Sequence, residues 1–220
     1  MKPILVVTGT RREAAVLRGA GLTVLCGGGD PAGLAGALAR KLPGAVGIIS
    51  FGMAGALDPA LRIGDWVIGE EVVAQQPIAC DSAWVAALAV DMAGAGFGPV
   101  LGRDALVATT AEKASLFAAH GALCADMDSH VAAAAAARAG LPFTVLRCIS
   151  DEAGQDLPPT IGVAMAPGGK LALSAILGSL VSRPGQVPAL WRSVTGFNRA
   201  YRVLRQGAAR LGPRLAFPEG

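Results

Sequence analysis

Charged and aromatic side chains are scarce in this sequence. They make up 16% and 5% of its 220 residues, whereas 53% of the residues are hydrophobic. A chain of this composition is not an intrinsically disordered segment, because it has enough apolar side chains to fill a core. At this length, a folded chain buries about 70% of the surface that its unfolded form exposes. The composition therefore indicates a tightly packed α/β protein.

Cysteines, histidines and long apolar runs are also few. The cysteines lie far apart, at Cys26, Cys80, Cys124 and Cys148. Neither a disulfide framework nor a zinc site is expected from such spacing, and the thiols are expected to be reduced. The two histidines have no Glu or Cys at ligand spacing, so no metal is expected. The N-terminal run "PILVV" is too short for a signal peptide or a membrane span, so we expect a cytoplasmic protein.

Positive charge is concentrated near the C-terminal end. Residues 183–220 contain seven arginines and one acid, Glu219, which gives them a net charge of +6. Because the whole chain carries +3, residues 1–182 carry −3. We therefore expect a main domain at 1–182 and a basic tail at 183–220.

Runs of strand length alternate with helical patterns along the main domain. Strands are expected over 3–7, 22–26, 45–51, 64–75, 105–110, 124–127 and 142–150, and helices over 11–21, 30–42, 82–93, 111–121 and 130–140. The run 45–51 has no polar alternation, which indicates a strand covered on both faces. Two further helices are expected at 170–182 and 188–206, separated by the linker "SRPGQVP". The pattern predicts a three-layer α/β fold with a mostly parallel central sheet and a C-terminal helical extension.

Polar residues and glycines follow several of the expected strands. The segments are Thr8–Glu13, the "GGGD" at 27–30, "FGMAGALDP" at 51–59, Asp126–Asp128, and Asp151. In open α/β sheets ligands bind outside the carboxyl ends of the strands, so these segments are expected to converge on one site.

Three motifs in order resemble the purine nucleoside phosphorylase and nucleosidase superfamily across residues 1–155. They are "FGMAGALDPALRIGDWVI", "DMDSHVAA" and "RCISDEAG". The resemblance implies the fold of that superfamily and cleavage of the C1′–N9 bond of a purine nucleoside. Such a reaction builds positive charge on the sugar and negative charge on the base, so it needs an acid for the base and hydrogen-bond acceptors for the sugar.

The resemblance also implies roles for the acidic residues. Asp151 matches the residue that protonates or hydrogen-bonds N7 of the leaving purine; the alternative is a turn or cap aspartate. Asp128 matches a carboxylate that binds the ribose hydroxyls, although the family more often has glutamate there, and Met127 matches the residue that packs on the ribose. The alternative is that Asp126, Asp128 and Ser129 only cap or charge the N-terminus of the following helix, and this simpler interpretation fits Asp126 better than Asp128.

Further roles follow from the same resemblance. Glu13 lies where the hydrolytic branch has a water-activating glutamate, and Arg147 matches an arginine near the nucleophile. The remaining expected contacts are Met53, Ala54 and Gly55 for substrate, and Gly9, Arg11, Gly28 and Gly29 for phosphate or the nucleophile. Alternatively, Arg11 is a solvated charge at a helix start and Arg147 extends from its strand to solvent.

The tail predicts an amphipathic helix. Its apolar stripe is Leu190, Val194, Phe197, Tyr201 and Leu204, and the arginines at 192, 199, 202 and 205 lie opposite or beside it. The stripe is suited equally to a membrane interface and to docking on the protein itself or a sister subunit. The tail resembles that of the hopanoid-associated branch of the superfamily, which implies a substrate met at a membrane.

The expected activity is release of adenine from a 5′-substituted adenosine, adenosylhopane by this resemblance, with phosphate as the favoured co-substrate and no other cofactor. The alternatives are a hydrolase of 5′-methylthioadenosine and S-adenosylhomocysteine and a non-catalytic nucleoside-binding module. A homo-oligomer on the inner face of the membrane, with no nucleic-acid partner, is also expected.

Overall fold

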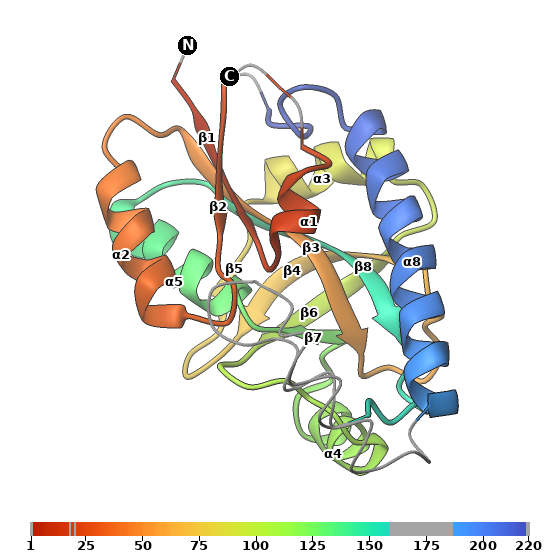
Figure 1. The fold of residues 1–220 in the computed structure, drawn as a ribbon. Coiled ribbons are helices and arrows are strands. Elements are labelled where there is room, and N and C mark those ends of the chain that lie inside the picture. The colour runs from red at the N-terminus through yellow and green to blue at the C-terminus, as the bar shows by residue number, and fades with distance from the viewer. Residues whose placement is uncertain (1, 18, 20, 159–186, 219–220) are drawn as a thin grey trace.

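Eight strands form one sheet within residues 2–17, 19, 21–158 and 187–218, which the computed structural model describes (Figure 1). The strands are β1 (Ile4–Thr8), β2 (Leu22–Cys26), β3 (Gly47–Ala56), β4 (Trp66–Val73), β5 (Ile78–Ala79), β6 (Gly96–Gly102), β7 (Cys124–Asp126) and β8 (Phe143–Asp151). The helices are α1 (Arg11–Ala14), α2 (Pro31–Lys41), α3 (Ser82–Asp91), α4 (Thr110–His120), α5 (Ser129–Ala139) and α8 (Val187–Arg210).

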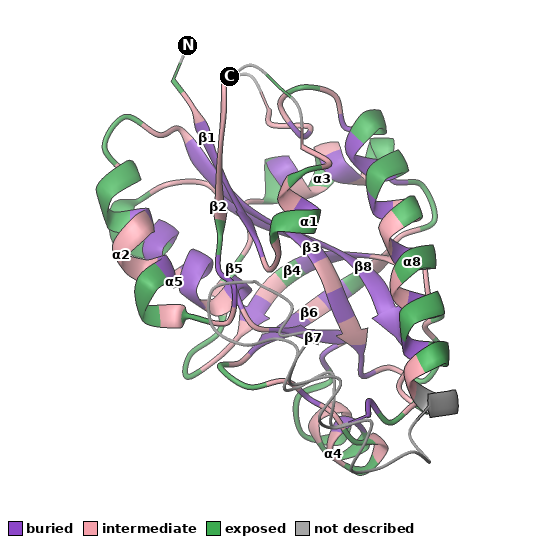
Figure 2. Cartoon of the chain, in the orientation of Figure 1, coloured by how far each residue is buried: buried purple, intermediate pink, exposed green. Residues whose placement is uncertain are grey.

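Helices cover both faces of this sheet, which confirms the predicted fold class (Figure 1). On one face, α2 and α5 pack Leu34, Leu38 and several alanines into one core cluster. On the other face, α3 and α8 contribute Trp84, Leu88 and Leu204 to a second cluster. Every residue of β1 and β8 is buried between these layers (Figure 2). The apolar run of β1 is typical of a strand covered on both faces, whereas β8 also buries polar residues, Arg147 and Asp151 among them.

Part of the sheet closes on itself. β3 pairs with β8, β8 with β4, β4 with β6, β6 with β7, and β7 returns to β3. Most of the strand pairs are parallel, as predicted, but the β3/β7, β4/β8 and β4/β5 pairs are antiparallel. β1 and β2 extend the sheet beyond this ring, next to β3. The ring brings the ends of β3, β7 and β8 together.

The glycine-rich segment after Phe51 belongs to β3 and is not the loop expected from the sequence. Gly52 pairs with Arg147 and Gly55 with Asp151. A Cβ atom at Gly52 would lie 2.7 Å from Glu13 Oε1, and one at Gly55 would lie 2.9 Å from Asp151 Oδ2. These glycines are therefore needed because acidic side chains approach the strand closely, and not because the chain turns.

Two other expected elements differ. The helix expected over 11–21 ends at Ala14. No strand forms at 105–110, and the strand of this region is β6, which lies earlier in the chain. The sequence pattern did not predict β6, because its sequence "GFGPVLG" contains glycine and proline, which usually mark loops. A Cβ at Gly98 would lie 3.0 Å from the Leu123 side chain, so close packing explains that glycine. The expected helix 170–182, the linker and the boundary at 182 lie outside the described residues.

Helix α8 packs on the sheet through small residues. Its buried positions are Ser193, Gly196, Ala200, Leu204, Gly207 and Ala208. A Cβ at Gly207 would lie 2.2 Å from the Trp66 ring, and one at Gly196 would lie 3.0 Å from the carbonyl oxygen of Ser150. The helix therefore comes close enough to touch the backbone of β8.

The apolar stripe expected on α8 lies only partly in this contact, with Leu204 and the half-buried Tyr201 packed against the same core. Of its five residues only Leu204 is buried, and Val194 is 45% exposed. The tail thus docks on the protein itself mainly through the small residues beside the stripe. Trp191, on the same helix, is 71% exposed. None of the helices in the described part of the chain is long and apolar enough to cross a membrane.

We expect Gly207→Val to lower the free energy of unfolding by about 1–3 kcal/mol, because the added side chain overlaps Trp66. The matched control is Ala209→Val, which introduces the same residue at an exposed position of the same helix. Urea denaturation of both variants measures the effect. Equal stability of the two variants would mean that α8 does not dock in this way.

Candidate active site

The carboxyl ends of β1, β3, β7 and β8 surround one pocket. Its lining comprises Gly9, Thr10, Glu13, Met53, Ala54, Gly55, Ala105, Leu106, Val107, Ala125, Asp126, Met127, Asp128, Ser150, Asp151, Leu157 and Phe197. Of the site residues expected from the sequence, those at 9, 13, 53, 54, 55, 127, 128 and 151 are therefore brought together here. Arg147, Arg11, Gly28 and Gly29 do not line the pocket.

Glu13 is held against β3 from the start of α1. The sequence "TRRE" forms a capping box, in which Glu13 Oε2 accepts hydrogen bonds from Thr10 N at 2.6 Å and Thr10 Oγ1 at 2.8 Å. Its other oxygen, Oε1, accepts from Met53 N at 2.6 Å. Burial raises the pKa of Glu13, and these hydrogen bonds and the charge of Arg147 offset that only in part. A fixed carboxylate with a raised pKa is suited to accept a proton.

Asp126 and Arg147 form a buried ion pair beneath the pocket. Arg147 Nε donates to Asp126 Oδ2 at 3.0 Å, and its terminal nitrogen donates to the hydroxyls of Ser50 and Ser129. Asp126 Oδ1 also accepts the backbone N–H groups of Asp128 and Ser129, each at 2.7 Å. Burial lowers the pKa of Arg147, but the neighbouring carboxylates, Asp126 foremost, raise it above its ordinary value. Asp126 thus caps α5 and neutralises the arginine, and Arg147 does not extend to solvent.

Asp128 has no such partners. It is buried, and no described group hydrogen-bonds its side chain. A Cβ at Gly9 would lie 3.0 Å from Asp128 Oδ2 and 3.2 Å from Glu13 Oε2, so the two carboxylates meet over that glycine. Burial and the negative charges of Asp126 and Glu13 raise the pKa of Asp128 to about 7, against the opposing effect of Arg147. Its oxygens are free to bind a hydroxyl-bearing ligand.

A bulge in β8 directs Asp151 toward β3. The pairing changes from Ile149 opposite Ala54 to Asp151 opposite Gly55, so that Ser150 is left out of register. Asp151 Oδ2 accepts a hydrogen bond from Lys113 Nζ at 2.6 Å, and Oδ1 accepts one from Ser150 Oγ at 2.8 Å. Asp151 is therefore a buried carboxylate with one cationic and one neutral partner.

The residues expected to bind an anion are arranged differently. Gly28 N donates to Gly9 O at 2.9 Å and Gly27 N to Thr8 O at 2.8 Å, so these N–H groups continue the β1/β2 pairing. Arg11 is exposed on α1. Among the described residues, no group of three or more His, Cys, Asp or Glu side chains is arranged to hold a metal ion. A role of Arg11, Gly28 or Gly29 in phosphate binding stays a prediction.

Sequence reasoning missed Lys113, Ser150 and Phe197. Lys113 lies in "TAEKASLF", where a lysine among alanines is typical of a solvated helix face. Phe197 belongs to the tail, and only its place on the expected apolar stripe marked it. With Ala105, Leu106, Val107 and Leu157, it contributes apolar lining to the pocket beside the carboxylates.

We expect Asp128 to make the protein less stable as the pH rises. Its pKa of about 7 lies above the ordinary value near 3.8, so the folded state binds the extra proton and stability falls between about pH 4 and pH 8. Asp128→Asn removes this titration. The free energy of unfolding of the variant, measured relative to the wild type, should therefore be higher at pH 8.5 than at pH 5 by on the order of 2 kcal/mol. Thermal denaturation at both pH values measures the gain. The exposed control Asp91→Asn should show none, and an equal response of the two variants would contradict the assignment.

Comparison with known proteins identifies the family. The model of the phosphorylase superfamily matches residues 3–165, whereas no curated protein matches the chain. Solved structures with the same fold include 5′-methylthioadenosine/S-adenosylhomocysteine nucleosidases. The Helicobacter pylori enzyme is 18% identical, with a TM-score of 0.63 over 82% of this chain and 98% of that chain. The Neisseria meningitidis enzyme is 15% identical, with a TM-score of 0.66 over 98% of both chains.

Futalosine hydrolase of Helicobacter pylori also shares the fold, at 16% identity and a TM-score of 0.61, over 82% of this chain and 97% of that chain. The family model spans most of the chain, including all four strand ends that surround the pocket. It confirms the expected class of enzyme, a nucleoside phosphorylase or nucleosidase. The chain belongs to the phosphorylase superfamily.

Proposed function

We propose that this enzyme hydrolyses the C1′–N9 bond of an adenosine that carries an apolar 5′ substituent, and that adenosylhopane is such a substrate. The observation that carries the proposal is the placement of Glu13 and Asp151 along β3. Glu13 bonds to the strand at Met53, and Asp151 approaches it at Gly55. The two carboxyls therefore contact β3 at separate positions, so that one can act on a water and the other on the leaving base, as the base and acid carboxyls of inverting glycosidases do.

The reaction divides between these two residues. The oxygen of water bonds to C1′ as the C1′–N9 bond breaks, and Glu13 takes the proton that the water loses. The electron pair of the broken bond stays on the purine, while Asp151 gives a proton to N7. Asp128 accepts hydrogen bonds from the ribose hydroxyls, and its negative charge stabilises the cationic sugar of the transition state.

The charge of the pocket supports water in place of the phosphate expected from the sequence. Four carboxylates line it, those of Glu13, Asp126, Asp128 and Asp151. The two cations beside them, Arg147 and Lys113, are each hydrogen-bonded to a carboxylate and do not line the pocket. The net negative charge of the site would repel a phosphate dianion but not a neutral water molecule.

The apolar side of the pocket supports a hydrophobic 5′ substituent. Leu106, Val107, Leu157 and Phe197 line the pocket and can contact an apolar group of the substrate. Because Phe197 lies on α8, that side opens toward the tail. A substituent leaving the pocket there would pass the exposed Trp191 and Val194 on the same helix.

The activity is tested by following free adenine from adenosylhopane, 5′-methylthioadenosine and S-adenosylhomocysteine, each with and without phosphate. We expect phosphate-independent release, with kcat/KM for the apolar substrate higher by about 10-fold or more, since each buried methylene contributes to discrimination. Glu13→Gln, which keeps the shape of the side chain, is the inactive control. Efficient turnover of the soluble nucleosides alone would support the rival hydrolase. Adenosine binding without release from any substrate would support the non-catalytic module, and phosphate-dependent release would reverse the choice of nucleophile.

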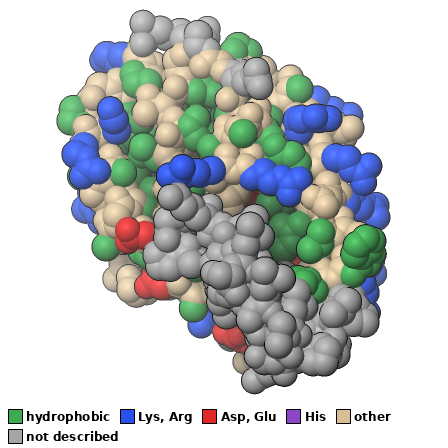
Figure 3. Space-filling model, in the orientation of Figure 1, with side chains coloured by type: hydrophobic (Ala, Val, Ile, Leu, Met, Phe, Trp, Pro, Cys, Tyr) green, Lys and Arg blue, Asp and Glu red, His purple; other side chains and the backbone are tan. Residues whose placement is uncertain are grey.

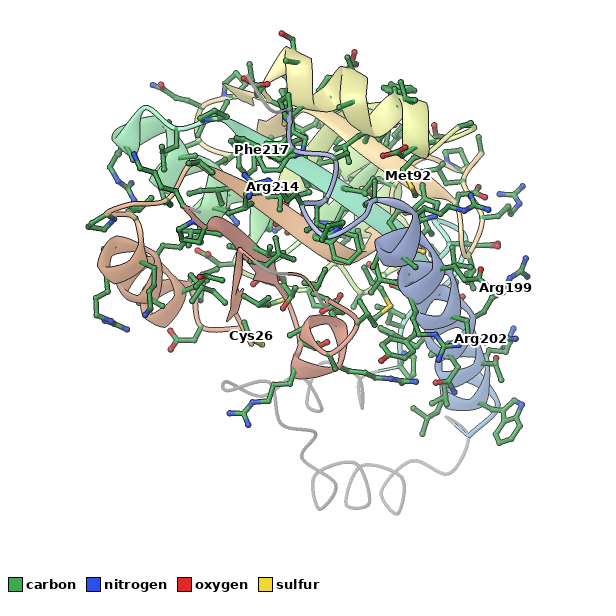
Figure 4. The ribbon with its side chains drawn as sticks, turned by 90° about the horizontal axis from the view of Figure 1, so that it is seen from above. Cys26, Met92, Arg199, Arg202, Arg214 and Phe217 are labelled. Atoms are coloured by element: carbon green, nitrogen blue, oxygen red, sulfur yellow. The ribbon has the colours of Figure 1, made fainter. Side chains whose placement is uncertain are left out.

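We also propose that the outer face of α8 contacts an anionic membrane. Arg199 and Arg202 point away from the sheet (Figure 4), and Lys and Arg side chains follow the edge of the molecule where α8 lies (Figure 3). Trp191 and Val194 are exposed on the same helix. Arginines near an anionic surface contribute about 1 kcal/mol each, and an exposed tryptophan is suited to the interface.

The enzyme is expected to sediment with anionic vesicles at low salt and less at high salt, because the arginine contribution is screened. The double change Trp191→Ser and Val194→Ser should reduce the bound fraction by roughly 10-fold. Its matched control is Val90→Ser with Phe97→Ser, which removes two exposed apolar side chains elsewhere. Equal losses for the two pairs, or no sedimentation of the wild type, would disprove contact through α8.

A further inference from the structure

Lys113 is a fully buried lysine in the middle of α4, with a side-chain exposure of 0%. Such lysines are rare, because removing an ammonium group from water costs several kcal/mol unless each of its protons finds an acceptor. All three donors of Lys113 are used, at 2.6 Å to Asp151 Oδ2, 2.8 Å to Glu152 O and 3.0 Å to Gln155 O. The side chain therefore joins α4 to the end of β8 and to the turn after it.

Two of these contacts have an evident structural use. They fix the turn at Glu152–Gln155, which is also tied to α8 through Gln155 Nε2 and Ser193 Oγ at 3.3 Å. A neutral hydrogen-bond donor would serve the two carbonyls as well, and without the cost of burying a charge. The third contact differs, because it directs the positive charge onto the pocket carboxylate Asp151.

We propose that Lys113 is the positioning residue of Asp151. This rests on the proposed role of Asp151 as the proton donor. By holding Oδ2, the lysine fixes the rotation of the carboxyl group beside Gly55, where the strand has no side chain. Its charge then stabilises the carboxylate that remains after the proton has passed to the purine.

The proton count is balanced in this scheme. In the structure Asp151 is a carboxylate paired with the ammonium of Lys113, and it takes up a proton from solvent with the substrate. It gives this proton to N7 as the electrons of the C1′–N9 bond move onto the purine, and so returns to the carboxylate that pairs with Lys113. Lys113 keeps its three protons throughout. When adenine has left, the proton that Glu13 took from water passes to solvent, so the enzyme is regenerated.

The role predicts a dependence on the leaving group. Lys113→Met keeps the length of the side chain but removes its charge and its donors. We expect it to lower kcat by roughly 10- to 100-fold for the adenine riboside, with little change in KM, because the affected group acts on the departing base. The loss should shrink along a series of 5′-substituted purine ribosides with less basic purines, which need less protonation. Asp151→Asn should show the same trend.

Two comparisons separate this role from a purely structural one. If Lys113 acts through Asp151, the double variant should lose little more than Asp151→Asn alone. Lys41→Met, at an exposed position of α2, is the matched control and should keep wild-type kcat. If Lys113→Met is not folded by circular dichroism, the same series is measured on Lys113→Arg, which keeps the charge and should retain more activity on basic purines than Lys113→Gln.

An equal loss across all leaving groups would overturn the inference and leave the hydrolase proposal intact, as would full additivity with Asp151→Asn. Unchanged kcat for Lys113→Met would overturn it as well. If the wild type released no purine from any riboside, the proposed function itself would fail, and the inference with it.

Discussion

The architecture of the site depends on the buried ion pair between Arg147 and Asp126. It connects four elements, because Arg147 lies on β8, Asp126 ends β7, and the serines that share the guanidinium lie on β3 and at the start of α5. A buried charge of either sign alone would be strongly destabilising, so the two residues constrain each other and the strands that carry them. The pair fixes the ends of β7 and β8, from which Asp128 and Asp151 reach the pocket, while Glu13 is held separately by Thr10 and Met53.

The pair also explains why two aspartates one residue apart have different properties. Asp126 has every oxygen occupied, by two backbone N–H groups, a hydroxyl and the guanidinium. Asp128 is buried with no hydrogen-bonding partner of its own, and burial, followed by the negative charges of Asp126 and Glu13, raises its pKa. One carboxylate holds the scaffold and the other is available to a ligand. Glu13 differs from both aspartates, because one of its oxygens caps α1 and the other accepts a hydrogen bond from β3.

The site could be predicted from the sequence where its residues lie at the ends of strands. The acidic residues that follow β7 and β8 could be assigned to one site, because the ends of neighbouring strands meet. Contacts between distant segments could not be read in this way. Nothing in the alanine-rich helix at 110–120 distinguishes a buried Lys113 from a solvated one, and the glycines of β3 were taken for a loop because a close side-chain approach leaves no local signal. The tail was correctly expected to be helical, but the face that docks consists mainly of glycine, alanine and serine, and of the large apolar residues that the periodicity emphasised only Leu204 is fully buried in it.

The closed ring of β3, β8, β4, β6 and β7 has a consequence for how the molecule opens. A ring has no terminal strand from which fraying can start, and the strands that carry Asp126 and Asp151 each have a neighbour on both sides. Local opening is then confined to the strands outside it, β2 at the far edge and the short β5. The backbone amides of β7 and β8 beneath the pocket are therefore expected to exchange with solvent mainly when the ring opens as a whole, whereas Glu13, on α1 outside the ring, is held by its own hydrogen bonds.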